Sequence, residues 1–213
     1  MKDKTFCTGS GIALIIGAIL MFVTMVLHPA GGGIDHLQSI STVIIVTHSI
    51  AIISVPITLV GFWGLSKLLD IQNIWTISAF SVIAVGLISV MMAGILNGLA
   101  LPFYVSGISE AMSEEGIHKS ILRYNFAFNQ ALTYVYMMAL AIAILIWSAR
   151  ILQTSVLNNL IAYFGILLSL AGIIIFLSGT LSPDLLGFRV FVFSSVAWII
   201  LTGILMIRWK EPD

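Results

Sequence analysis

The stretch FCTGSGIALIIGAILMFVTMVL, residues 6–27, contains no charged side chain and ends at His28-Pro29. As a helix rising about 1.5 Å per residue it would span roughly 33 Å, which is enough to cross the hydrocarbon core of a bilayer. The hydrophobic region of a secretory signal is usually only about 7–15 residues long. We therefore predict a first spanning helix over residues 6–28.

Five further apolar runs follow at regular intervals. A closed β-barrel would show short alternating segments instead, so the long runs favour helices. The sequence predicts an all-α membrane protein, a single compact bundle of six transmembrane helices. Their expected ranges are 6–28, 41–69, 75–101, 125–152, 157–181 and 190–209.

The composition agrees with this class of protein. Only 8% of the 213 residues are charged, whereas 60% are hydrophobic. A soluble domain usually has about 25% charged residues, so most of this surface must face the lipid bilayer. The net charge is zero, which gives no electrostatic basis for binding nucleic acid. The single cysteine, Cys7, excludes an intramolecular disulfide and a cysteine-based zinc site.

Basic residues in the short loops predict the orientation. With the N-terminus inside, the cytoplasmic set is Lys2, Lys4, Lys67, Arg150, Arg208 and Lys210, and the outer set is Lys119, Arg123 and Arg189. The excess predicts both termini on the cytoplasmic side of a bacterial inner membrane. Trp75, Trp147 and Trp209 would then lie in the inner aromatic belt. The longest loop, residues 102–125, would lie outside and could hold a short surface helix.

Polar side chains gather in the predicted outer third of the bundle. On the fourth helix, Asn125, Asn129, Thr133 and Tyr136 share one face by their spacing. We expect a polar pocket that opens to the outside beneath the first loop. Its candidate lining residues are His48, Asn97, Asn129, Gln130, Thr133, Tyr134 and Tyr136.

Four interpretations of these polar residues remain open. They can simply hydrogen-bond one another and specify helix packing. They can bind a small ligand or a lipid headgroup. A metal such as zinc can be held by His28, Asp35, His36 and His48, although their spacing matches no compact metal motif. A b-type haem can be clamped between His28 and His48.

Small residues mark two seams for close helix packing. Gly94 and Gly98 form one seam, and Gly165, Gly172 and Gly179 form the other. Such seams serve packing within the bundle, a homo-oligomer or a larger membrane complex. We favour packing within the chain, because six helices must pack on one another in any case.

The function expected from the sequence is that of a non-catalytic binding or accessory protein with an outer pocket. No acidic or basic side chain lies at mid-membrane, which disfavours ion-coupled transport. No phosphate loop or partnered nucleophile is apparent. The alternatives are a histidine-metal enzyme acting on a lipophilic substrate and a packing subunit of a larger complex.

Overall fold

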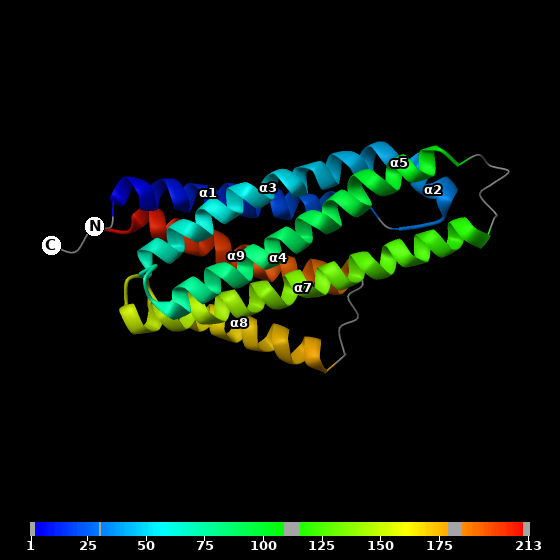
Figure 1. Cartoon of the computed structure of the whole chain (residues 1–213). Helices are drawn as coiled ribbons and strands as arrows, with labels where there is room; N and C mark the ends of the chain where they lie inside the picture. Colours follow the sequence, from blue (N-terminus) through cyan, green and yellow to red (C-terminus); the bar gives the residue numbers. More distant parts are fainter. Residues whose placement is uncertain (1–2, 30, 109–115, 179–184, 211–213) are drawn as a thin grey trace.

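The structure, a computed structural model, describes residues 3–29, 31–108, 116–178 and 185–210, and the side chains of all of these except 185–188. Every regular element in the described part is helical (Figure 1). The elements are α1 (Lys4–Leu27), α2 (Ile34–Ser39), α3 (Ser41–Leu68), α4 (Ile74–Ile95), η1 (Leu96–Ala100), α5 (Leu101–Ser106), α7 (Gly116–Thr154), α8 (Asn159–Leu177) and α9 (Leu185–Arg208).

Among the residues that the structure describes, six helical segments are long and apolar enough to span a membrane. They are α1, α3, the continuous α4–η1–α5 segment, α7, α8 and most of α9. Large apolar side chains such as Ile53, Leu160 and Leu167 lie on the outside of the bundle, more than half exposed. Exposed apolar area of this extent suits contact with lipid. The prediction of an all-α, multi-pass membrane protein is confirmed.

The helix bounds differ most from the predicted ones around the longest loop. The third spanning segment continues to Ser106 instead of ending near residue 101, and α7 begins at Gly116 instead of 125. The predicted bounds missed these turns because Pro102 marks a helix end in the sequence, and because residues 116–124 include His118, Lys119 and Arg123. Their apolar side packs in a small second core of Ile34, Leu37, Ile44, Leu101, Val105, Ile108 and Leu122. The last helix also begins earlier than predicted, at Leu185 instead of 190.

This second core builds a cap at one end of the bundle, formed by α2, α5 and residues 116–124 of α7. Helix α2 was not predicted. The Gln38 amide on α2 donates to the Val105 and Ile108 carbonyls at 2.6 and 2.9 Å. Helix α7 has 39 residues and, at about 58 Å, exceeds the roughly 30 Å hydrocarbon core. It is therefore long enough to carry the cap beyond the hydrocarbon.

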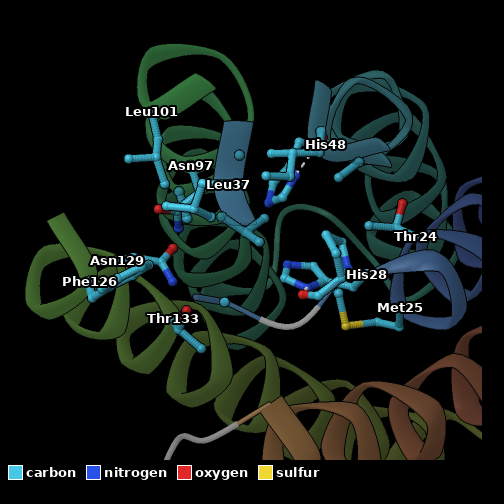
Figure 2. A pocket seen from close by; sticks show the side chains of 17 residues that line it. Thr24, Met25, His28, Leu37, His48, Asn97, Leu101, Phe126, Asn129 and Thr133 are labelled. Carbon is cyan, nitrogen blue, oxygen red and sulfur yellow. Dashed lines mark hydrogen bonds between the residues drawn. The ribbon is translucent and has the colours of Figure 1, made fainter. Parts of the chain in front are cut away.

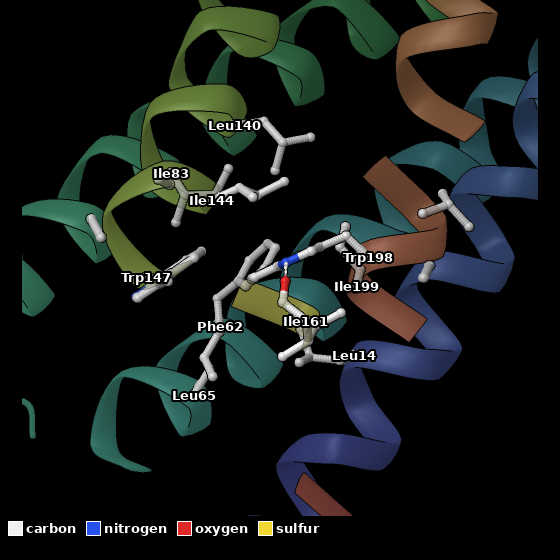
Figure 3. Packing of buried hydrophobic residues seen from close by; sticks show 14 of the residues in the cluster. Leu14, Phe62, Leu65, Ile83, Leu140, Ile144, Trp147, Ile161, Trp198 and Ile199 are labelled. Atoms are coloured by element: carbon white, nitrogen blue, oxygen red, sulfur yellow. Dashed lines mark hydrogen bonds between the residues drawn. The ribbon is translucent and has the colours of Figure 1, made fainter. Parts of the chain in front are cut away.

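The opposite end of the bundle holds the start of α1 and the end of α9 (Figure 1). We call it the terminal end. Toward this end the main core stacks Phe62 on Trp147 and Trp147 on Trp198, with centroids 4.8 and 6.5 Å apart (Figure 3). The Trp147 indole donates to Ser66 and the Trp198 indole to the Ile161 carbonyl. Each N–H is thus satisfied inside the bundle.

The expected aromatic belt is wrong for two of its three members. Trp75 is exposed at 60%, as a belt residue would be. Trp147 is fully buried, and Trp209 is only 7% exposed. Hydropathy places a residue along the membrane normal but does not say which side of its helix faces the core, so it missed this burial.

Candidate functional site

A cavity of about 250 Å³ lies between α1, α3, η1 and α7, next to the cap (Figure 2). Pro29 and Gly31 of the first loop line it, as expected of a roof over the pocket. Its polar lining comes from Thr24, His28, His48, Asn97, Asn129 and Thr133, and apolar side chains such as Met25, Leu37 and Phe126 line the remainder. Ligand sites are typically of this kind, mostly apolar with a few convergent polar groups.

Two histidines meet in this cavity. The His28 and His48 ring centroids are 4.9 Å apart, with the rings edge to face at 61°. His28 follows the last residue of α1, and His48 lies two turns into α3. Figure 2 shows both rings directed into the cavity. The fold therefore joins two residues that the sequence places on different helices.

Backbone carbonyls fix the tautomer of both rings. His28 Nδ1 lies 2.9 Å from the Pro29 carbonyl, and His48 Nδ1 lies 2.8 Å from the Ile44 carbonyl. Because a carbonyl only accepts, Nδ1 is the nitrogen that carries the proton in each neutral ring. The Nε2 atoms keep their lone pairs, so the cavity contains two imidazole acceptors.

Burial lowers the pKa of His28 from 6.5 to about 4. The neighbouring His48 and the Arg189 cation lower it further, and these effects together outweigh the hydrogen bond to Pro29. An imidazolium in this place would be desolvated and face another cation. The His28 ring is accordingly neutral near pH 7.

Asn97 reaches the cavity from a widened helical turn. Pro102 has no N–H for the Gly98 carbonyl, and just before it the Leu101 N–H bonds to the Leu96 carbonyl, five residues back. Such π-turns often occur at functional sites. The Asn97 side-chain carbonyl accepts from the Asn125 amide at 2.7 Å, which joins η1 to α7 beside the cavity.

Gly98 provides the space for His48. A Cβ at Gly98 would collide with the His48 side chain, and one at Gly94 would touch Ile52 on α3. The Gly94/Gly98 seam therefore faces α3 of the same chain. In the second seam, Gly165 packs on Ser148 and Trp198, and Gly172 approaches Phe191. Gly179 lies outside the described residues.

Of the seven predicted pocket residues, four line the cavity: His48, Asn97, Asn129 and Thr133. Gln130 is exposed on the outside of α7. Tyr134 packs edge-on against Phe176 of α8, with centroids 4.8 Å apart. Tyr136 is buried, and its hydroxyl lies 3.4 Å from the Met21 sulfur. These last three do not line the cavity.

The four predicted metal ligands separate into two groups. His28 and His48 meet, whereas Asp35 and His36 are exposed on α2 and do not line the cavity. Within the described part of the chain, no three His, Cys, Asp or Glu side chains gather closely enough to hold one ion. The edge-to-face contact also differs from a haem clamp, in which the two rings lie on opposite faces of the macrocycle.

Sequence reasoning missed several residues at the site. Thr24 and Met25 line the cavity one turn before His28, and that i, i+3/i+4 spacing is the signal that predicts a shared face. Arg189 was assigned only to the outer basic set. In the structure its guanidinium donates from α9 to the Met25 and His28 carbonyls, at 3.1 and 2.7 Å.

Comparison with known proteins gives no match. The chain matches no family model, no curated protein and no solved structure. The functional argument therefore rests on the cavity itself.

Proposed function

We propose that this chain is a binding protein of the cytoplasmic membrane, whose cavity accepts a small ligand or a lipid headgroup from the outer side. The observation that carries the proposal is the convergence of His28, His48, Asn97, Asn129 and Thr133 on one cavity with apolar walls. Four different helical segments supply these groups. If these side chains served only helix packing, we would expect them to hydrogen-bond directly with one another.

The lining favours binding over catalysis. Among the described residues, those that line this cavity include no carboxylate, lysine or cysteine. General acid–base and nucleophilic mechanisms usually employ such groups in pairs with a histidine. A hydrolytic metal enzyme would gain from Asp35 and His36, which point elsewhere. A ligand that binds the lone pairs of the two Nε2 atoms suits the site better.

Two observations support placing the cavity on the outer side. Lys4, Lys67, Arg150, Arg208 and Lys210 lie at the terminal end, opposite the cap; Lys2 lies outside the described residues. Cytoplasmic loops carry such an excess of basic residues. Arg189, from the smaller outer set, is also used inside the protein, where it bonds the α1 carbonyls.

The packing-subunit alternative receives less support. The described glycines of both seams lie against helices of the same chain, so the seams are already used. A subunit would then need another surface to meet its partner.

Two neighbouring residues on α7 give a matched test. Asn129→Leu removes a polar lining group, and Gln130→Leu makes the same change on the exposed side of the helix. Native mass spectrometry of protein released from its own membrane should show a bound mass in the wild type and in Gln130→Leu. Asn129→Leu should lose that mass while remaining folded. Equal spectra for all three proteins would contradict a ligand that binds this cavity through Asn129.

A further inference from the structure

The two cavity histidines have the hydrogen-bond pattern that is typical of metal-binding histidines. A histidine ligand usually donates its other ring N–H to a carbonyl, carboxylate or water, which fixes the ring and its tautomer. Both rings do so here, through the Pro29 and Ile44 carbonyls. With centroids 4.9 Å apart, the two rings are close enough for their Nε2 atoms to share one small ion.

A third donor of different chemistry lies beside them. Met25 is buried, lines the same cavity, and precedes His28 by three residues on one face of α1. Figure 2 shows its sulfur on the side of the cavity where the His28 ring lies. A thioether is a weak hydrogen-bond acceptor, but it is a good ligand for soft metal ions.

The charge of the donor set selects the ion. Imidazole and thioether are neutral, no carboxylate or thiolate lines the described cavity, and Arg189 holds its positive charge close to His28. A dication would bring two uncompensated charges into a poorly solvated site, and the desolvation cost rises steeply with charge. Zinc sites usually complete a tetrahedron with carboxylate or thiolate ligands. A monovalent, soft ion suits this cavity better.

Extending the proposed function, on which this step rests, we propose that Met25, His28 and His48 bind Cu(I) as the cavity's ligand. Two nitrogen donors and one sulfur donor satisfy a three-coordinate soft ion. The site is formed by the end of α1 and the second turn of α3, and Arg189 holds the α1 end in place.

The test measures Cu(I) affinity in detergent, under anaerobic conditions with ascorbate, by competition with a chromophoric Cu(I) chelator. All proteins carry Cys7→Ser, because Cys7 is the single cysteine of the sequence and its thiol is also a soft ligand for Cu(I). The lining variants are Met25→Leu and His48→Gln. Their controls are Met92→Leu, exposed on α4, and His36→Gln, exposed on α2.

We expect one equivalent of Cu(I) in the Cys7→Ser protein and in both controls, with at least a tenfold loss of affinity in each lining variant. Met25→Leu conserves side-chain volume and should fold normally, so its result does not depend on His48→Gln remaining folded. X-ray absorption of the loaded protein should show two nitrogen neighbours and one sulfur.

The inference is overturned if the parent protein binds no Cu(I), if both lining variants bind as tightly as the controls, or if Zn(II) displaces Cu(I) at equal concentration. A bound organic mass that is sensitive to Asn129→Leu, in a protein without copper affinity, would reject the copper site and leave the proposed binding function standing. If the protein shows neither Cu(I) binding nor a bound organic mass, the copper site and the proposed binding function are both rejected.

Discussion

The guanidinium of Arg189, at the start of the last spanning helix, bonds the carbonyls of Met25 and His28 at the end of the first. The final carbonyls of a helix have no partner within it, and a cation there also interacts favourably with the helix dipole. Arg189 contributes no side chain to the cavity lining. It positions two residues that do.

Replacing this arginine should loosen the end of α1. Hydrogen bonds from a charged group contribute about 1.5–3 kcal/mol each, and we expect Arg189→Leu to cost on the order of 2 kcal/mol in unfolding free energy. Arg189→Lys should restore part of that loss. Thermal unfolding in detergent measures both, beside Arg123→Leu as an exposed control. Equal melting of Arg189→Leu and Arg123→Leu would show that the contact contributes nothing.

Adding a methyl group at Gly98 should displace His48. The new Cβ would overlap the His48 side chain, and overpacking of this kind costs about 1–3 kcal/mol. We expect Gly98→Ala to lower the melting temperature and weaken ligand binding. Gly9→Ala, with nothing within 4 Å of the added atom, should leave both unchanged. An unchanged melting temperature of Gly98→Ala would mean that α3 and η1 leave room for the added methyl group.

Stability should fall on acidification because His28 resists protonation in the folded state. Its pKa is lowered to about 4 from 6.5 by burial, by His48 and by Arg189. Below pH 6.5, His28 therefore binds a proton in the unfolded chain but not in the folded protein. The free energy of unfolding declines as a result until the pH reaches about 4. His28→Gln should flatten this part of the curve of unfolding free energy against pH. An unchanged slope would show that His28 is solvated.

The orientation can be tested with two exposed positions in a Cys7→Ser background. Ser39→Cys lies in the cap, and Lys210→Cys lies at the terminal end. The positive-inside argument predicts that a membrane-impermeant maleimide labels Ser39→Cys in intact cells and labels Lys210→Cys only after lysis. The reverse pattern would place the cavity on the cytoplasmic side.

Sequence periodicity correctly grouped some lining residues that share one helix. Asn129 and Thr133 were predicted together from their i, i+4 spacing, and both line the cavity. The sequence also predicted Gln130, the neighbour of Asn129, as a lining residue. This was wrong because neither spacing nor hydropathy shows how far the buried face extends around α7. Gln130 is exposed.

Periodicity does not predict contacts between different helices. The sequence groups His28 and His48 only because both residues can bind a metal or a haem. Their meeting depends on the packing of α1 against α3, where Gly17 faces Thr58 and Gly61 faces Leu14. The cap was missed for a related reason: Leu122 and Val105 lie far apart in the sequence, and they are buried only by packing together with residues of α2, α3 and α5 in the second core.

The most direct test of a ligand site fills the cavity and leaves its polar groups in place. Ala51 lines the cavity from α3. A larger side chain at this position would occupy much of the cavity volume of about 250 Å³. In native mass spectrometry, folded Ala51→Phe protein should lack the bound mass that the wild type carries. A bound mass that persists in folded Ala51→Phe would contradict the assignment of this cavity as the binding site.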